Sequence, residues 1–353
     1  MRVAVIDVAA SCGGAASVLM EFYQYIKENI SDIEWYFVLS QPLIEPTKEI
    51  HVVLCPDVKK NWINRLRFDV IDAGRVLKQI NPDLVLNLQN TTVRIGKTVQ
   101  FLYVHQSIPF QKLKCFSFLK KEERIYAVYQ YVIGSMIKKS IKKADRVFVQ
   151  TEWMKDAVSS YTSKSKIDKI APRIEIPEGI GEAPVVMDGK HFFFPANKMP
   201  YKNHKVIMDA VRILLARDVS DITVSFTLGE EEKMPNGLKQ IQCIGSQSRE
   251  TVMQMYTRNV LVFPSFIETF GLPLAEARAV GGLILAADTP FARELLSGYE
   301  NAYYFDPFDA NELAALMERV IHKEITTVPV KKQEYEKVNS WEIVVNRIKE
   351  CVL

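Results

Sequence analysis

Two patterns of hydrophobic and polar positions alternate along the chain. Short runs rich in β-branched and aromatic residues are separated by longer segments in which apolar residues recur at helical spacing. In the first half, the runs predicted as strands are residues 2–8, 35–39, 84–88, 98–104 and 146–150. In the second half they are residues 191–195, 223–228, 240–244, 260–263, 283–286 and 302–305. This alternation predicts, in each half, a parallel sheet covered by helices on both faces.

The length of the chain and a change of composition near its middle predict two domains. A chain of 353 residues is long for a single hydrophobic core. Residues 161–190 are rich in Ser, Lys, Pro and Gly and lack a long periodic pattern. We therefore expect one domain at residues 1–170 and a second at 171–335. Residues 336–353 contain an amphipathic helix, which we expect to cross back and pack on the first domain. Its apolar side carries Trp341, Val344, Val345 and Ile348.

Composition places the chain among ordinary globular proteins. Hydrophobic residues make up 48% and charged residues 25%, and the net charge of +3 gives no reason to expect a nucleic-acid partner. The five cysteines are scattered without CxxC spacing, which fits a reducing compartment and argues against disulfides or structural zinc. No apolar run reaches the roughly 18 to 20 residues that span a bilayer. The apolar N-terminus is typical of a buried strand rather than a signal peptide, so we expect a cytoplasmic protein.

The segment with the most specific chemistry is residues 263–281, FPSFIETFGLPLAEARAVG. A strand ends at its start, a short loop follows, and a helix begins near Leu272. The exposed N–H groups and positive dipole end of a first helical turn form an anion site, and Gly271 lets a ligand approach the backbone. Glu268 in the loop and Glu276 in the helix offer carboxylates to the paired hydroxyls of a sugar or ribose. Two glutamates at this spacing also occur as solvated side chains, so the pair alone decides nothing.

The string ETFGLPLAEA resembles the signature of family 4 glycosyltransferases, the retaining branch of the GT-B architecture. The Glu-x7-Glu spacing, the FG pair and the LP helix start all match. Further matches follow in the same order as in the family: CGGAASVL, YVHQSIPF, ADRVFVQTEWMKDAV, IEIPEGI, FPANKMPYKNHKVIMDAV, IGSQSRETVMQMYTRNVLVFPS and YFDPFDANELAALM. Together these cover nearly the whole chain and most resemble enzymes that build capsular or O-antigen polysaccharides. The resemblance implies an α/β fold of two Rossmann-like domains that face each other across a cleft.

The resemblance also implies roles for individual residues. His105, Glu268 and Lys202 would act in catalysis: His105 beside the donor sugar, Glu268 on its hydroxyls and Lys202 on the diphosphate. Glu276 would bind the ribose hydroxyls, and backbone around residues 244–246 would contact the base. The full set implied to bind the donor is Gly13, Gly14, Asn197, Lys202, Gly245, Ser265, Phe270, Gly271, Leu272 and Glu276.

Three of these positions keep a second interpretation. A glycine pair such as Gly13–Gly14 often serves only as a tight turn. His105 follows a predicted strand, where parallel sheets present ligands, but a satisfied core histidine also occurs there. Asn197 departs from the family, which commonly has arginine five residues before the lysine. The amide brings hydrogen-bond donors without charge, and the neighbouring Lys198 is a candidate for the missing charge.

The predicted reaction needs neither a metal nor a cofactor. No DxD-type acid pair stands in a suitable loop, and the nucleotide sugar itself is a substrate. The expected reaction retains the donor's configuration by front-face substitution, with Lys202 and the helix N-terminus stabilising the departing diphosphate. The expected donor is a UDP- or GDP-sugar. The expected acceptor is a glycan or a lipid-diphosphate-linked glycan used in cell-surface polysaccharides.

A basic segment follows the histidine motif. Residues 111–143 contain nine Lys or Arg against two acids. Residues 111–121 are short, basic and aromatic, which indicates contact with an anionic membrane surface or a lipid-diphosphate acceptor. The chain would then lie peripherally on the inner face of the plasma membrane. Apolar positions in residues 125–143 follow helical spacing, and we expect that helix to bury its apolar face in the core and to hold its lysines in water.

Three alternatives remain open from the sequence. One is another two-Rossmann enzyme acting on nucleotide sugars, such as a 2-epimerase or an inverting transferase. Another is a sugar-nucleotide-binding subunit without catalysis, for which Asn197 is the only hint. A nucleic-acid-binding role is weaker still, because the basic residues cluster locally while the global charge is nearly balanced.

Overall fold

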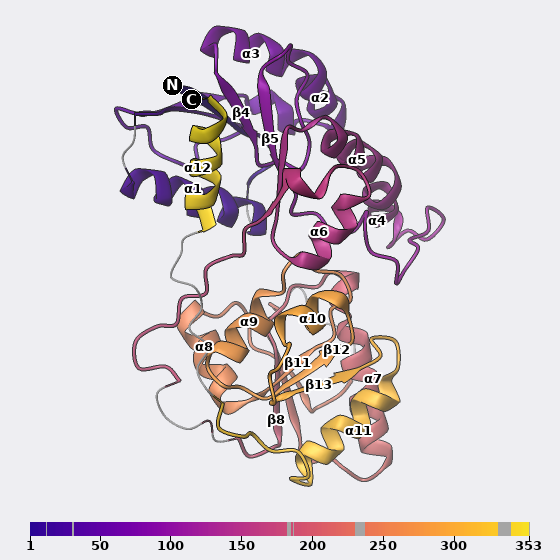
Figure 1. Cartoon of the computed structure of the whole chain (residues 1–353). Coiled ribbons are helices and arrows are strands. Elements are labelled where there is room, and N and C mark those ends of the chain that lie inside the picture. The colour runs from indigo at the N-terminus through magenta and orange to yellow at the C-terminus, as the bar shows by residue number, and fades with distance from the viewer. Residues whose placement is uncertain are drawn as a thin grey trace. The chain divides into compact units, whose positions relative to one another are not determined.

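The computed structural model describes residues 1–11, 13–29, 32–181, 185, 187–229, 237–330 and 340–352. The chain divides into two compact units: Met1–Ala171 with Val338–Leu353, and Pro172–Lys337. The first boundary lies one residue beyond the position expected from the sequence, and the second lies two residues beyond it. Figure 1 shows both units as helices packed around a sheet. None of the described helices is long and apolar enough to cross a membrane.

The first unit is built on a parallel sheet with strand order β3-β2-β1-β4-β5-β6-β7. Its strands are β1 (Arg2–Asp7), β2 (Glu34–Leu39), β3 (Ile50–Leu54), β4 (Leu84–Asn87), β5 (Val99–Tyr103), β6 (Arg146–Val149) and β7 (Ile167–Lys169). The strand order reverses between β1 and β4, which makes the carboxyl ends of these two strands a topological switch point, where ligands of open α/β sheets bind. The sequence had not predicted the two edge strands, β3 and β7.

Helices cover both faces of this sheet (Figure 1). The helices of the first unit are α1 (Gly13–Glu28), α2 (Trp62–Arg67), α3 (Ala73–Ile80), α4 (Arg124–Ala127), α5 (Gly134–Lys143), α6 (Glu152–Ser159) and α12 (Ser340–Val352). α1 and α12 share one apolar core with Val3 and Val5 of β1. The alternate residues of the sheet pack against α3 and, further along, against α5 and α6. The register pairs Asn87 of β4 with Leu102 of β5. The side chains that pack against α3 and those that pack against α5 and α6 therefore lie on the same face of the sheet.

The C-terminal helix α12 belongs to the first unit. The ring of Trp341 lies 4.9 Å from that of Phe22 in α1 and 5.7 Å from that of Tyr103 in β5. Val344 and Ile348, one and two turns further on, are fully buried in the same core. The apolar side read from the sequence therefore seats this helix against α1 and the sheet.

The helix expected at residues 125–143 is oriented differently from the prediction at its N-terminal end. α4 and α5 are joined through a π-helical turn, Val128–Ile133. The small residues Ala127 and Gly134 face inward, and a Cβ on Gly134 would lie only 2.8 Å from the Cβ of Pro109. Because this close approach needs the small face, Ile125 and Val132 are left 60% and 53% exposed. The expectation that the apolar face is buried holds only from Ile137 onward.

The second unit has a six-stranded parallel sheet with order β10-β9-β8-β11-β12-β13. The strands are β8 (His191–Phe194), β9 (Thr223–Phe226), β10 (Ile241–Cys243), β11 (Val260–Phe263), β12 (Ile284–Ala287) and β13 (Ala302–Phe305). The helices are α7 (His204–Ala216), α8 (Arg249–Arg258), α9 (Leu272–Ala279), α10 (Pro290–Leu295) and α11 (Ala310–Ile321). The order reverses between β8 and β11, so this unit also has a switch point, and the signature segment follows β11.

Candidate active site

Two loops meet at the carboxyl edge of the second sheet. One follows β8 and the other follows β11, and these strands are neighbours across the switch point. Lys202 ends a short 3-10 turn in the first loop, and its Nζ donates a hydrogen bond of 2.6 Å to Oε1 of Glu268 in the second loop. Both side chains are mostly buried, at 17% and 16% exposed. The two motifs that the sequence singled out for the donor are thus joined through one ion pair.

Asn203 holds this edge together, and the sequence analysis did not find it. Its backbone is left-handed, with φ 60°, and it precedes the first residue of α7. Its side-chain amide donates to the carbonyl of Pro307 at 2.6 Å and to that of Pro264 at 3.4 Å. Asn tolerates the left-handed region better than most residues, so Asn directly before a helical pattern was the available signal. It fixes the loop that carries Lys202 against the loop that carries Glu268.

The first turn of α9 has the features of an anion site. Gly271 precedes the helix at φ 100°, a backbone conformation that suits glycine. Pro273 has no N–H group, and the N–H of Leu274 is bonded to the carbonyl of Gly271 at 3.0 Å. Within the described residues, the N–H groups of Gly271 and Leu272 have no acceptor. Phe270 is buried behind this turn, so only its backbone is available to a ligand.

Glu276 lies one turn further into α9 and is 8% exposed. Its Oε2 accepts a hydrogen bond of 3.2 Å from Tyr256, and its Oε1 lies 3.4 Å from the guanidinium of Arg249. Burial raises the pKa of Glu276, and the charge of Arg249 opposes that rise. The sequence analysis missed both partners, although their spacing of seven residues, two turns of α8, was a usable signal. The glutamate expected to bind ribose is therefore held in a fixed orientation.

The other residues of this unit that were expected to bind the donor differ in their exposure and hydrogen bonding. Asn197 is exposed, as a ligand contact requires. Ser265 is fully buried, and its Oγ has no partner among the described residues, so it supports the loop rather than facing a ligand. Gly245 has φ 72° and uses its N–H on the carbonyl of Leu228 at 3.0 Å. The N–H of Ile244 is likewise bonded to Phe226, so neither of these amides is available to a base.

The region around Lys202 is positively charged beyond Lys202 itself. His204, the first residue of α7, is buried, and its pKa is lowered to about 4, chiefly by burial and further by the charges of Lys202 and Lys198. Both ammonium groups are thus close enough to act on the same ring. A phosphate beside Lys202 would also lie in the field of Lys198, which is compatible with Lys198 supplying charge that Asn197 lacks.

In the first unit, His105 follows β5 and is held by backbone groups. Its Nε2 lies 2.8 Å from the carbonyl oxygen of Leu88, and its N–H donates to Oδ1 of Asn90 at 2.7 Å. The ring stacks on Tyr103. Burial lowers the pKa of His105, so the imidazole is neutral near pH 7. Its Nε2 also lies 3.1 Å from Nδ2 of Asn90, so this ring atom faces both a carbonyl acceptor and an amide donor.

The glycine pair is part of a helix rather than of a loop. α1 begins at Gly13, so Gly13 and Gly14 lie in its first turn. A Cβ on Gly14 would meet nothing within 4 Å among the described atoms, so packing does not require glycine at position 14. The first turn of α1 follows the carboxyl end of β1, at the switch point of the first sheet.

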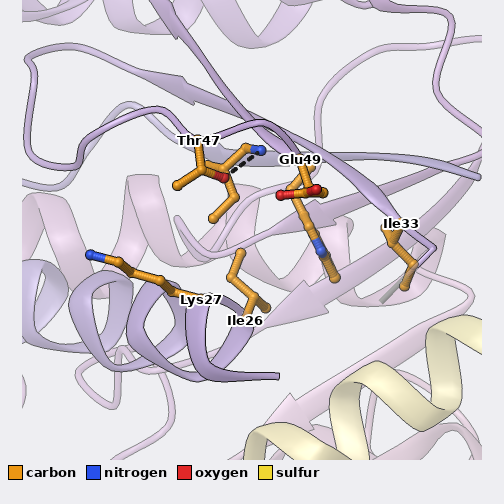
Figure 2. Close-up of a pocket in the computed structure, with 7 residues that line it drawn as sticks. Ile26, Lys27, Ile33, Thr47 and Glu49 are labelled. Atoms are coloured by element: carbon orange, nitrogen blue, oxygen red, sulfur yellow. Dashed lines mark hydrogen bonds between the residues drawn. The ribbon is translucent and has the colours of Figure 1, made fainter. Parts of the chain in front are cut away.

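A cavity of about 160 Å³ in the first unit lies elsewhere. It is lined by residues from the C-terminal part of α1 and from the segments that begin β2 and β3, including Ile26, Lys27 and Ile50 (Figure 2). The amino ends of parallel strands are opposite the edge that presents His105. This cavity is therefore not part of the candidate site.

Known structures share this fold over nearly the full length of the chain. The lipopolysaccharide outer core galactosyltransferase WaaB, without ligand, superposes with a TM-score of 0.64 and 17% identity, covering 99% of this chain and 100% of that chain. Sucrose-phosphate synthase from Thermosynechococcus elongatus gives 0.69 and 15%, covering 99% and 98%. HepE from Anabaena, in complex with UDP-glucose, gives 0.60 and 15%, covering 100% and 98%. The fold is thus that of the GT-B glycosyltransferases, with two Rossmann-like α/β units.

A family match is confined to the second unit. Residues 180–337 match the sequence profile of the family "Glycosyl transferases group 1", and they make up nearly all of that unit. The matched residues include Lys202, Glu268 and Glu276. No curated protein matches the sequence significantly. Among the described residues, no group of three or more His, Cys, Asp or Glu is arranged to hold a metal ion.

Proposed function

We propose that this protein is a retaining glycosyltransferase of family 4 that transfers a sugar from a UDP- or GDP-sugar to a glycan or lipid-linked glycan of a cell-surface polysaccharide. The observation that carries the proposal is the 2.6 Å pair between Lys202 and Glu268, set beside the first turn of α9 in a group 1 glycosyltransferase domain. HepE was crystallised with UDP-glucose and WaaB is a lipopolysaccharide galactosyltransferase, which supports this donor and acceptor class.

The second unit supplies complementary groups for each part of the donor. The N–H groups of Gly271 and Leu272, with the positive end of α9 and the ammonium of Lys202, suit a diphosphate. Glu268 accepts hydrogen bonds from the sugar hydroxyls, and Glu276, oriented by Tyr256 and Arg249, accepts them from the ribose. Because Lys202 and Glu268 already hold each other in place, little side-chain entropy remains to be lost when the donor binds.

The proposed reaction is a front-face substitution. The bond between the anomeric carbon and the diphosphate oxygen breaks, and the acceptor oxygen forms its bond on the same face. The acceptor proton passes to the departing phosphate oxygen, whose charge Lys202 and the first turn of α9 stabilise. Glu268 binds hydroxyls and does not attack the anomeric carbon. Lys202 and the helix N–H groups supply the positive charge that a metal ion provides in other enzymes, so we propose that the reaction is independent of added metal.

His105 in the first unit is proposed to contact the donor sugar as a neutral imidazole. Its Nε2 is engaged by the Leu88 carbonyl and the Asn90 amide, so Nδ1 is the ring atom proposed to hydrogen-bond a sugar hydroxyl. This role requires no change of charge during the reaction. The first unit is accordingly proposed to bind the acceptor, and the protein to work on the cytoplasmic side of the membrane.

The proposal is tested by measuring thermal stabilisation with UDP, GDP, ADP and their common sugar conjugates. A ligand at a hundred times its dissociation constant stabilises the folded state by about 2.7 kcal/mol. One nucleotide class should raise the melting temperature. Glu276→Ala should abolish that shift for both the diphosphate and the free nucleoside. Lys202→Met should weaken the diphosphate by about tenfold or more and leave the nucleoside unchanged, because it removes only a charge-assisted contact to phosphate.

Controls separate this proposal from its alternatives. Lys205→Met removes a lysine three positions further on that is exposed and paired with Asp209, and it should not change binding. A product with the donor's anomeric configuration, formed from the stabilising donor and a glycan acceptor, supports retention, whereas the opposite configuration or an epimerised free donor overturns it. The absence of any nucleotide shift would overturn the proposed function.

A further inference from the structure

The outer layer of the first unit carries an unusual number of exposed apolar side chains. Large apolar residues are solvent-exposed along the segment that precedes α4 and along the outer side of α4 and its π-helical turn: Leu113, Phe118, Leu119, Ile125, Val128, Tyr131 and Val132. A second stripe lies on α2 and the π-helical turn Phe68–Asp72 that follows it: Ile63, Leu66, Val70 and Ile71. The described residues of the second unit have only five such side chains, and these are dispersed in sequence.

Both groups lie on the same face of the first unit's sheet. α3, which continues α2, and α5, which continues α4, pack on the same side of the strands, as the register between β4 and β5 requires. Figure 1 shows α2, α4 and α5 in one layer of that unit. The exposed apolar positions on α2 and the π-helical turn after it are separated by three, four and one residues. They therefore form one stripe on the side of the helix that is turned away from the sheet.

The segment before α4 is folded firmly onto it, so its exposed residues are presented by an ordered surface. The N–H of Phe116 donates to the side chain of Gln130 at 2.9 Å, and Gln130 donates to the carbonyl of Lys114 at 2.9 Å. The ring of Phe118 lies 5.8 Å from that of Tyr131. Leu119 stands at the tip and is 89% exposed. Exposing this ordered apolar tip to water costs free energy, and contact with a partner surface would remove that cost.

The charge around this surface is strongly positive. Residues 111–143 carry nine basic and two acidic side chains, and one of the acids, Glu123, is buried and paired with Lys114 and Lys120. Lys112, Lys121 and Arg124 are exposed beside the apolar tip. Apolar side chains ringed by long basic ones match the boundary between acyl chains and anionic headgroups, where the lysine stems reach up to the phosphates.

We infer that the first unit docks on an anionic lipid surface through both stripes of this outer layer, with Leu119, Ile125 and Val132 inserted below the headgroups. The inference rests on the proposed function in its membrane aspect, and it extends the contact from the basic segment 111–121 to the exposed faces of α4 and α2. The small inward face at Ala127 and Gly134 is what frees Ile125 and Val132 for this contact.

The test is co-sedimentation of the full chain with vesicles of phosphatidylcholine alone or mixed with phosphatidylglycerol. We expect binding to the anionic vesicles only, weakened by salt. Three single substitutions add the same charge at exposed apolar positions. Leu119→Asp is expected to lower partitioning about tenfold or more, and Val70→Asp by about threefold or more, because each puts a carboxylate into the docked face. Met20→Asp, on α1 at the opposite face of the sheet, is the matched control and should change little.

Equal binding by Leu119→Asp and Met20→Asp overturns the docking surface, and so does equal binding to the two kinds of vesicle. Unchanged binding by Val70→Asp overturns the part of the proposal that includes α2. Nucleotide thermal shifts are measured on the same preparations. Loss of vesicle binding with an intact nucleotide shift overturns the surface alone, whereas a missing nucleotide shift with intact vesicle binding overturns the enzyme proposal alone. A folded Leu119→Asp variant is expected because that side chain makes so little contact.

Discussion

At the scale of single residues, side chains with shifted pKa values or fixed orientations lie at the carboxyl ends of the strands. The signature segment allowed Glu268 and Glu276 to be predicted, and the separate segment FPANKMPYKNHKVIMDAV allowed Lys202 to be predicted, in both cases through the resemblance to a family. Tyr256, Arg249 and Asn203 were not predicted. Their roles depend on contacts between segments far apart in sequence, such as the 104 residues between Asn203 and Pro307, which no local pattern records.

Asp7, the last residue of β1, is predicted to make stability depend on pH. It is 1% exposed, its Oδ2 has no partner among the described residues, and burial raises its pKa to about 7 from 3.8. Between these two values the folded state binds more protons than the unfolded state, so this residue removes stability as pH rises. Asp7→Asn removes the titrating carboxyl group and therefore abolishes this loss of stability at higher pH. Relative to the wild type, the variant should gain on the order of 4 kcal/mol between pH 4 and pH 8.

Urea unfolding at several pH values measures this gain. Asp57→Asn is the control, because that side chain is 75% exposed and lies in the same unit. The stability difference between Asp57→Asn and the wild type should be nearly constant with pH. A constant difference for Asp7→Asn as well would show that Asp7 is not buried as a carboxylate, and the account of this strand end would be wrong.

At the scale of elements, the sequence predicted the interior strands of both sheets and the edge strands β10 and β13 of the second sheet, but it missed both edge strands of the first sheet. β1, β4, β8 and β11 are continuous buried apolar runs, because both faces of a central parallel strand are covered. β3 and β7 lie at the two edges of the first sheet, are half-exposed and, for β7, only three residues long. Their pattern is not distinct from a loop. The α4 error has a different cause: the apolar residues at helical spacing include Ile125 and Val132, which are exposed, because the inward face is built of Ala127 and Gly134.

The packing of α12 leads to a prediction about the stability of the first unit. Trp341 is 6% exposed and contacts aromatic rings from α1 and β5. Trp341→Ala should lower the free energy of unfolding by about 3 to 5 kcal/mol, because it leaves a large cavity in a shared core. Asn346→Ala on the exposed side of the same helix is the control and should cost less than about 0.5 kcal/mol. Similar values for the two variants in urea unfolding would mean that α12 does not complete this core.

At the scale of the whole molecule, the two units share one sheet architecture and differ in the side chains that they carry. Each unit has a parallel sheet with one switch point, and each places polar side chains there. At its switch point the second unit places the Lys202–Glu268 ion pair, the helix start after Gly271 and the oriented Glu276, which together suit a nucleotide sugar. Only the first carries the exposed apolar layer. Sequence patterns predicted the two sheets because both follow from strand and helix periodicity, whereas this division of labour depends on which side chains the fold exposes.

This division predicts where a nucleotide protects the chain from hydrogen exchange. The nucleoside diphosphate that stabilises the protein should slow exchange in residues 197–204 and 264–276, because a phosphate there takes up the N–H groups of Gly271 and Leu272 and rigidifies the Lys202 loop. Protection should persist in EDTA, since Lys202 and the start of α9 provide the positive charge. Exchange in β3, at the far edge of the first sheet, should not change and serves as the internal control. Protection confined to the first unit would place the donor site in the wrong half of the chain, and protection that disappears in EDTA would require a metal ion that the proposed chemistry omits.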